Sequence, residues 1–188
     1  MNATTSGDYV VRAIRADEWE AVKRLRLVAL RDPVADIAFL ETYDDALGRP
    51  DSFYRERAAR SAEEPSGARQ FVAEAADGEW AGTVTVLIEE AGSVDWAGLP
   101  VERRQGHVVG VFVRPEHRGS GLVKALFDAG VTWARERGAE RVRLLVHEDN
   151  PRAQGAYRKA GFVPSGVTVQ LESDGGKREF EFVLLWPA

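Results

Sequence analysis

The strongest constraint on the fold comes from residues 106–138, where an apolar strand passes through a glycine turn into an amphipathic helix. The strand reads "GHVVGVFV" and the turn reads "RGSG". The helix that follows, expected over 120–137, carries an apolar stripe from Leu122 to Trp133 and ends at Gly138. A second apolar strand, "RVRLLVH", comes next. Because a helix between two strands of one sheet makes a crossover, this segment predicts a parallel strand pair.

Elsewhere, apolar runs and turn residues predict antiparallel strands and further helices. Asp77-Gly78 between two apolar runs is typical of a β-hairpin. Asn150-Pro151 is typical of a helix start, and Gly161 of a helix end. The other expected elements are a strand over 9–14, a helix over 17–31, two short helices between 32 and 64, and strands over 162–171 and 177–186 around Asp174-Gly175-Gly176.

These elements predict a single domain over residues 1–188 in the α/β (α+β) class. Its sheet should be mixed but mostly antiparallel, with about seven strands, helices on its faces and a central parallel strand pair. Hydrophobic residues make up 44% of the chain, which is ordinary for a globular domain with one core.

Composition and charge exclude several functional classes. The chain has no cysteine, which rules out a thiol nucleophile and a disulfide framework, and with three histidines we expect no metal site. A net charge of −5 argues against a nucleic-acid partner. We expect no membrane partner, because the sequence has no continuous apolar run near the eighteen residues that a membrane-spanning helix needs. The start "MNATTSGDYV" lacks signal-peptide features, so the expected location is cytoplasmic.

The glycine turn has the features of an anion site without matching the common nucleotide motifs. A P-loop needs Gly-Lys-Ser/Thr after four intervening residues, and a dinucleotide fingerprint needs a third glycine where this chain has Lys124. What remains is a helix start whose amides lack intrahelical acceptors, beside residues small enough for close approach of an anion. A simple tight connection between strand and helix is the alternative interpretation.

Two longer motifs carry a resemblance to a known family. The run "VGVFVRPEHRGSGLVKAL", followed by "NPRAQGAYRKAGF", resembles the GNAT superfamily of acyl-CoA-dependent N-acetyltransferases. That family's signature is Arg or Gln, two residues, Gly, one residue, then Gly or Ala. The resemblance covers residues 70–188, and the N-terminal third only in its order of elements. One position departs, because Val123 stands where the family has Gly or Ala.

The resemblance implies acetyl-CoA as the acyl donor, with coenzyme A as product. The strand after residue 110 would pair with the pantetheine arm, and the amides from Gly119 to Lys124 would hold the pyrophosphate. The cofactor-binding residues expected on this basis are Val111, Phe112, Val113, Arg118, Gly119, Ser120, Gly121, Leu122, Val123, Lys124, Asn150 and Tyr157.

Acyl transfer from a thioester to an amine needs a proton donor and a proton acceptor. Asn150 and Tyr157 share one stripe of the predicted helix, and the resemblance implies that Tyr157 protonates the leaving sulfur. Some relatives carry a glutamate acceptor where this chain has Leu145. His147, two residues on and on the same strand face, is the candidate base, because its ordinary pKa is about 6.5.

Other acceptors remain open. They are a water chain and three residues near the same strand in sequence, Glu102, His107 and Glu116. Carboxylates between Asp32 and Asp45 could attract a cationic amine, although a solvated acidic helix face is the simpler interpretation.

The leading hypothesis is transfer of an acetyl group to a primary amine of a small molecule, by direct attack in a ternary complex. Two alternatives stay open: acetylation of a protein N-terminus or lysine, and a non-catalytic acyl-CoA sensor. The sequence leaves the oligomeric state open, a homodimer being one option.

Overall fold

A computed structural model describes residues 4–62, 67–171 and 176–186. The strands are β1 (Thr4–Ser6), β2 (Tyr9–Ala13), β3 (Ala68–Ala75), β4 (Trp80–Glu89), β5 (Gln105–Val113), β6 (Arg141–His147), β7 (Val163–Gln170) and β8 (Arg178–Leu185). The helices are α1 (Trp19–Ala29), α2 (Ala35–Ala38), α3 (Tyr43–Gly48), α4 (Asp51–Ala62), α5 (Leu122–Glu136) and α6 (Pro151–Lys159), with short 3₁₀ turns at Ala16–Glu18 and Pro115–His117.

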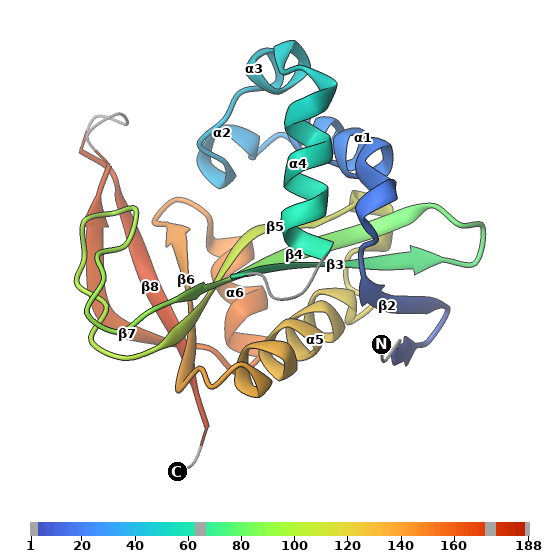
Figure 1. The fold of residues 1–188 in the computed structure, drawn as a ribbon. Helices are drawn as coiled ribbons and strands as arrows, with labels where there is room; N and C mark the ends of the chain where they lie inside the picture. Colours follow the sequence, from blue (N-terminus) through green and yellow to red (C-terminus); the bar gives the residue numbers. More distant parts are fainter. Residues whose placement is uncertain (1–3, 63–66, 172–175, 187–188) are drawn as a thin grey trace.

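The described strands form one sheet in the order β1-β2-β3-β4-β5-β6-β8-β7. Only β5 and β6 pair in parallel, and every other neighbouring pair is antiparallel. The helices α1 to α4 lie on one side of this sheet, and α5 and α6 lie on the other (Figure 1). The mixed sheet with a central parallel pair is therefore confirmed, and the short strand β1 is the addition to the expected seven.

The local predictions differ from the structure mainly between residues 32 and 64. Three helices form there instead of two short ones, and α4 is 12 residues long. The helix α3 ends at Gly48 and α4 starts at Asp51, so Arg49 and Pro50 separate the two helices. Asp174 and Gly175 of the last expected turn lie outside the described residues. Among the described residues, no helix has the length and apolar character needed to cross a membrane.

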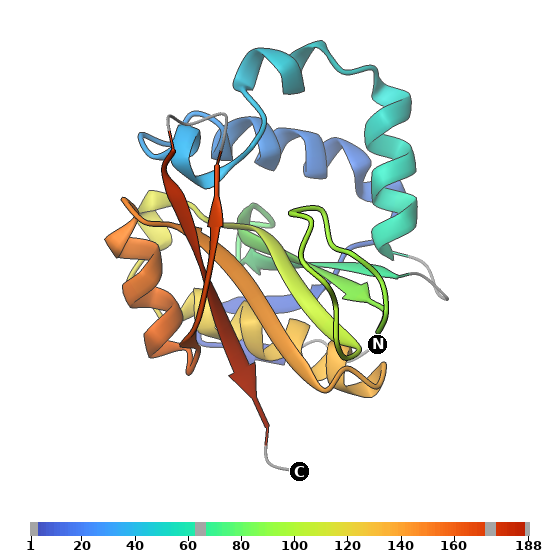
Figure 2. The same ribbon diagram turned by 90° about the vertical axis from the view of Figure 1, so that its left-hand side faces the viewer.

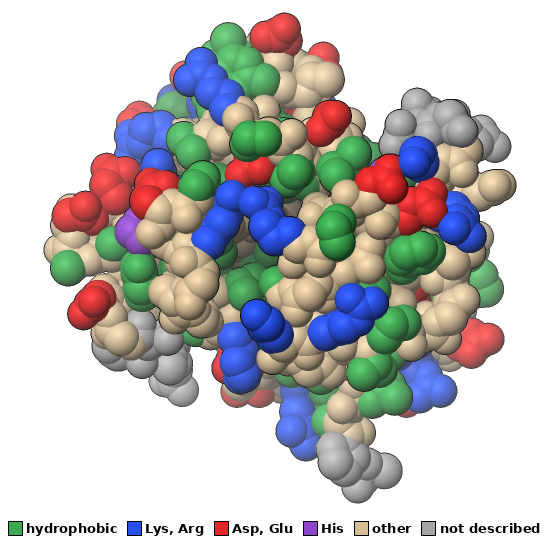
Figure 3. Space-filling model, turned by 180° about the vertical axis from the view of Figure 1, so that it is seen from behind, with side chains coloured by type: hydrophobic (Ala, Val, Ile, Leu, Met, Phe, Trp, Pro, Cys, Tyr) green, Lys and Arg blue, Asp and Glu red, His purple; other side chains and the backbone are tan. Residues whose placement is uncertain are grey.

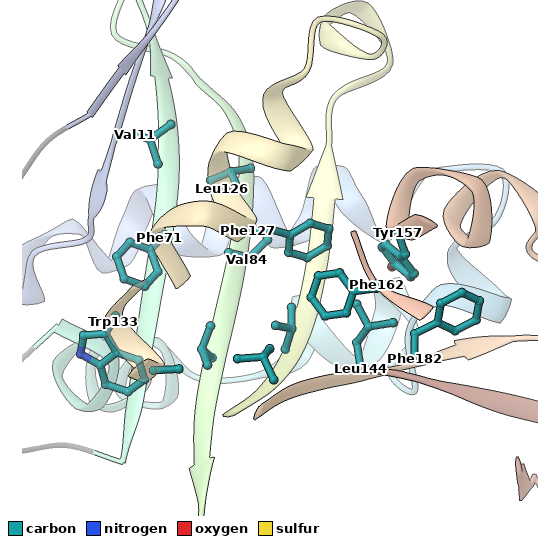
Figure 4. Close-up of a cluster of buried hydrophobic side chains, with 14 of the residues drawn as sticks. Val11, Phe71, Val84, Leu126, Phe127, Trp133, Leu144, Tyr157, Phe162 and Phe182 are labelled. Atoms are coloured by element: carbon teal, nitrogen blue, oxygen red, sulfur yellow. The ribbon is translucent and has the colours of Figure 1, made fainter. Parts of the chain in front are cut away.

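The main core lies between the sheet and the pair α5 and α6. Leu126 and Phe127 of α5 face Val84 of β4 and the aromatic rings of Phe162 and Tyr157 (Figure 4). A second cluster joins the opposite sheet face to α1 and α4. The helix α5 approaches β4 closely because residue 130 is glycine: a Cβ there would lie 2.7 Å from Cγ2 of Val86.

The parallel pair is short, and its two strands then separate. Residues 105–107 of β5 pair with 141–143 of β6, and no later residue of β5 pairs with β6 within the described sheet. On its other side, β5 keeps pairing with β4 as far as Val113 but contains a bulge, since Val109 faces Thr85 and Phe112 faces Thr83. Gly110 lies in this bulge with φ +63, a conformation that favours glycine. The sheet is therefore open between the later halves of β5 and β6.

A buried ionic cluster holds the strands together at the paired end of this opening. We call it the Arg143 cluster, and it consists of Arg143, Glu89, His107, Glu181 and Asp95. The Arg143 side chain, 2% exposed, bonds to both Glu89 oxygens at 3.1 Å, to Glu181 at 3.3 Å and to Asp95. His107 Nδ1 lies 2.8 Å from Glu89 Oε1. Asp95 belongs to the loop between β4 and β5, which passes beside β5 (Figure 2), so the cluster also fastens that loop.

Truncation in the core should lower stability strongly. Leu126→Ala removes a fully buried side chain, and we expect the free energy of unfolding to fall by about 2–5 kcal/mol. The measurement is urea denaturation followed by circular dichroism. Leu47→Ala, at a side chain 50% exposed, is the matched control and should change stability by less than about 0.5 kcal/mol. Equal effects of the two substitutions would contradict this description of the core.

The Arg143 cluster should also produce acid sensitivity. Burial alone would raise the pKa of Glu89, but hydrogen bonds from His107 and Arg143 lower it to about 2. Because this pKa lies below its unfolded value, Glu89 stabilises the fold above about pH 4.5, and the contribution disappears as the pH falls towards 2. We expect Glu89→Gln to be less stable at pH 7 and to lose less stability than the wild type between pH 4.5 and 2.

Denaturant titrations across this pH range measure the effect. Glu90→Gln is the matched control, because Glu90 is the next residue along the chain and its side chain is 61% exposed beside Arg104. Parallel pH profiles for the wild type and Glu89→Gln would show that Glu89 is not ionised in the cluster.

Candidate functional site

A cleft of about 700 Å³ lies between the separated halves of β5 and β6. Residues 108–113 of β5 and 144–147 of β6 line its two sides, the start of α5 and one face of α6 line its ends, and α2 covers it. Basic side chains surround a hollow with hydrophobic residues at its bottom on this face of the molecule (Figure 3). The basic residues in the lining are Arg118, Lys124, Arg152 and Lys159. The cleft therefore combines an apolar interior with a cationic rim.

The glycine turn forms the end of the cleft where α5 begins. Gly119 and Gly121 have φ +80 and +81, and a Cβ built on either would meet no atom within 4 Å. The two glycines therefore provide the left-handed conformation and leave space beside the backbone. Gly121 is the N-cap of α5, so the amides that follow it lack intrahelical acceptors. The Lys124 amide differs from the prediction, because it already donates to the Gly121 carbonyl at 3.0 Å.

Three of these basic residues, Arg118, Arg152 and Lys124, pair with carboxylates of the chain itself. Arg118 donates through Nε to the Val113 carbonyl at 3.0 Å and forms an ion pair with Asp32. Arg152 Nη2 lies 3.6 Å from the other oxygen of Asp32. Burial opposes ionisation of Asp32, but the Arg118 hydrogen bond keeps its pKa below the usual range. Lys124 pairs with Asp128 at 2.7 Å.

The remaining predicted cofactor residues lie mostly where expected. Val111, Phe112, Val113, Leu122 and Val123 line the cleft with the two glycines. Ser120 is outside the lining, and its hydroxyl donates to the His117 carbonyl at 2.7 Å. The departure at Val123 does not block the cleft, because this side chain packs partly against the main core.

Asn150 and Tyr157 reach the cleft from α6. The Asn150 side chain caps the helix by accepting the Ala153 amide at 3.1 Å, as the Asn150-Pro151 pair predicted. The Tyr157 ring packs edge-on against Phe127, with 5.6 Å between ring centroids, and lines the cleft (Figure 4). Burial raises the pKa of Tyr157 above its ordinary value, and the negative charge of Glu179 raises it further. The phenol therefore keeps its proton at neutral pH.

His147 lines the cleft at the end of β6, with 2% of its surface exposed. Its Nδ1 accepts the backbone N–H of Asp149 at 3.1 Å. A neutral imidazole that accepts at Nδ1 carries its own proton on Nε2, so its basic lone pair is occupied by the amide. The role of His147 as proton acceptor stays a prediction, and this geometry weighs against it.

The weaker candidates for the base lie outside the cleft lining. Glu102 and Glu116 are exposed on the surface, and His107 belongs to the Arg143 cluster. The carboxylates between residues 32 and 45 are also less available than the sequence suggested. Asp32 pairs with Arg118, and Glu41 pairs with Arg26 and Arg49. The helix α2 presents Val34, Ile37 and Ala38 to the cleft instead.

Sequence reasoning missed four ionisable residues of the cleft lining: His117, Arg152, Lys159 and, as the one carboxylate among them, Glu179 of β8. Its register partner in the sheet is His147, so the two side chains leave the same face of neighbouring strands. Burial raises the pKa of Glu179 above its ordinary range, and the electrostatic interaction with His147 only partly offsets this. The alternation in "REFEFVLL" places Glu179 and Glu181 on one face, but the sequence does not show which strand lies beside them.

Comparisons with known proteins agree with this geometry. The model of the Acetyltransferase (GNAT) family matches residues 32–162. Streptothricin acetyltransferase of Streptomyces lavendulae is 31% identical over 143 residues, covering 76% of this chain and 67% of that protein. Mycothiol acetyltransferase of Saccharomonospora viridis is 40% identical over 100 residues, 53% of this chain, but the match spans only 31% of that longer protein.

A solved structure extends the agreement to nearly the whole fold. Ribosomal-protein-S5-alanine acetyltransferase from Vibrio fischeri superposes with a TM-score of 0.74, covering 98% of this chain and 97% of that chain, at 14% identity. This likeness concerns the fold alone. The family match, however, extends over well more than half of the sequence and includes the glycine turn, Asn150 and Tyr157. The chain therefore belongs to the GNAT family of acetyltransferases.

Proposed function

We propose that this protein is an N-acetyltransferase that moves the acetyl group of acetyl-CoA to a primary amine of a small molecule, by direct attack in a ternary complex. The observation that carries the proposal is the cleft between β5 and β6, which joins an unpaired strand edge, an open helix N-terminus and Tyr157 in one cavity. The streptothricin and mycothiol acetyltransferases among the relatives, named for small molecules, favour a small acceptor.

The residues of the cleft fit an acyl-CoA. The backbone of residues 108–113 has no strand partner on the side of β6, so it can pair with the amides of a pantetheine arm as a further strand would. Gly119 and Gly121 leave space for a diphosphate beside the first amides of α5. Arg118 and Arg152 can exchange Asp32 for phosphate oxygens, because charge-assisted bonds to phosphate are at least as strong as those to a carboxylate.

Acetyl-CoA supplies an activated acyl group when it is bound. The chain must then orient the amine, receive its proton and give a proton to the departing sulfur. Tyr157 is the donor in this proposal, because it is protonated at neutral pH and lines the cleft beside Asn150. A covalent acyl-cysteine is excluded, since the sequence contains no cysteine. Direct attack by the amine on the bound thioester is the step that remains.

A panel assay tests the proposal and its alternatives. Purified protein with acetyl-CoA is offered polyamines, aminoglycosides, streptothricin-type antibiotics, amino acids and peptides, and products are identified by mass spectrometry. Acetylation of a small amine supports the proposal. Transfer to peptides alone would favour protein acetylation, and binding of acetyl-CoA without transfer to any amine would favour a sensor.

Removing the Tyr157 hydroxyl should impair the chemical step selectively. We expect Tyr157→Phe to lower kcat by about 10²-fold or more, because the sulfur then leaves without a positioned proton donor. Acetyl-CoA affinity, measured by calorimetry, should change little. Tyr43→Phe on α3 is the matched control, since this tyrosine is bonded to Arg31 and lies outside the cleft lining. Turnover that is equal in the wild type and Tyr157→Phe would remove Tyr157 from the mechanism.

A carboxylate in the glycine turn should prevent cofactor binding. We expect Gly121→Asp to lower the affinity for coenzyme A by at least about 10-fold in calorimetry, because the new charge repels phosphate and occupies its space. Gly92→Asp is the matched control: Gly92 has the same φ of +81 and the same open surroundings, but it lies in the loop after β4. Equal losses in both variants would mean that backbone strain, and not the anion site, explains the effect.

A further inference from the structure

Glu179 lines the cleft from β8, the strand paired with β6, and no arginine or lysine is bonded to its carboxylate among the described contacts. The two basic residues that precede it in the chain bond to other carboxylates: Lys177 bonds to Asp149, and Arg178 bonds to Glu148. Glu181, two residues along, is held in the Arg143 cluster. Val169 of β7 is its other register partner and has no polar side-chain atom.

One oxygen of Glu179 has no hydrogen-bond partner. Oε2 is buried and unpaired. Oε1 of Glu181 is also unpaired, but its other oxygen accepts from Arg143, as the carboxylates of Glu89, Asp32 and Glu41 each accept from an arginine. A buried carboxylate oxygen without a donor is costly, by about 1–3 kcal/mol or more. In a native structure such a group calls for an explanation, and a catalytic role or a bound water or ion are among those known. Because Glu179 lines the cleft, a substrate is one group that can supply the donor.

On the basis of the proposed function, we infer that Glu179 is the general base, which accepts the proton of the attacking amine, and that His147 orients it as a positioning residue. The inference stands on the register pairing of the two residues, the place of Glu179 in the cleft lining and its orphaned oxygen. Some relatives carry a glutamate proton acceptor where this chain has Leu145. In this chain the neighbouring strand β8 supplies the carboxylate instead. Leu145 pairs with Glu181, one step along the same face from Glu179.

The proton steps balance between two residues of the chain. As the amine nitrogen bonds to the acyl carbon, its proton passes to Glu179, and as the carbon–sulfur bond breaks, the proton of Tyr157 passes to sulfur. Exchange with water then returns a proton from Glu179 to the phenolate. The net reaction is amine plus thioester giving amide plus thiol, with no oxidant or metal involved.

The electrostatics of the cleft make these two steps support each other. The negative charge of Glu179 is one of the causes that raise the pKa of Tyr157. When Glu179 takes up a proton this charge disappears, so the phenol becomes more acidic at the moment when the sulfur needs a proton. Among the ionisable groups, His147 on β6 acts on Glu179, Arg152 on α6 acts on Tyr157, and Asp149 lies beside His147. The other ionisable residues of the lining are Asp32, His117, Arg118, Lys124 and Lys159, and α2 contributes only apolar side chains to it.

The experiment compares Glu179→Gln with the wild type and with Glu148→Gln, the matched control. Glu148 is a neighbouring carboxylate, bonded to Arg178 outside the cleft lining. With the best amine from the panel, we expect Glu179→Gln to lower kcat by about 10²-fold or more and to lose the acidic limb of the pH profile. Its affinity for acetyl-CoA and its thermal stability should not fall, because a neutral amide replaces a charge that burial disfavours. Glu148→Gln should behave like the wild type.

His147→Gln separates the two candidate bases. If Glu179 is the base, this variant keeps an acidic limb, shifted in pH, and loses less kcat than Glu179→Gln. Abolition of the acidic limb in His147→Gln but not in Glu179→Gln would overturn the inference and make His147 the base. Retention of the wild-type kcat and pH profile in Glu179→Gln would overturn it as well.

A second measurement does not depend on turnover. Carbon-13 NMR of labelled glutamate carboxyls, with the Glu179 signal assigned by its loss in Glu179→Gln, should show titration above the ordinary pKa of about 4.3. Titration at or below that value contradicts the inference even when the enzyme is active. Wild-type protein that binds acetyl-CoA but acetylates no amine would instead refute the proposed function, and the inference with it.

Discussion

The short pairing between β5 and β6 is the constraint on which the rest of the structure depends. Three residues of each strand pair in parallel, and then the strands separate, so the middle of the sheet contains an opening lined by backbone groups that the fold itself does not satisfy. The bulge at Gly110 lets β5 keep its partner β4 while it turns away from β6. A cleft built in this way is both deep and polar along one edge, which suits a long ligand with amide groups.

Electrostatic pairing stabilises both ends of this opening. The Arg143 cluster ties β4, β6, β8 and the loop before β5 together where the strands still pair. At the other end, Asp32 connects the segment after α1 to Arg118, in the turn before α5, and to Arg152 of α6. The first cluster is buried, whereas the arginine side chains of the second are partly exposed. In the proposed function, phosphate oxygens replace Asp32 as the partner of these arginines.

Local patterns predicted the elements that depend on neighbouring residues. The glycine turn at 119–121 before a helix, the Asn150 cap and the turn at Asp77-Gly78 are all encoded within a few positions, and the structure contains each of them. The residues that the sequence did not reveal depend on tertiary contacts. The Arg118–Asp32 pair joins positions 86 residues apart, and Glu179 meets His147 only through strand order and register. The length of α4 was underestimated because its sequence, "DSFYRERAARSA", is too polar to show a clear apolar stripe.

The most direct test of the account is hydrogen–deuterium exchange with and without coenzyme A. If the opening between β5 and β6 is the acyl-CoA site, the ligand should slow exchange in residues 108–113 and 119–123, and leave β2 and β3 unchanged. Protection confined to other parts of the chain, or no protection at a saturating concentration, would contradict the central claim that the separated strands form the cofactor site.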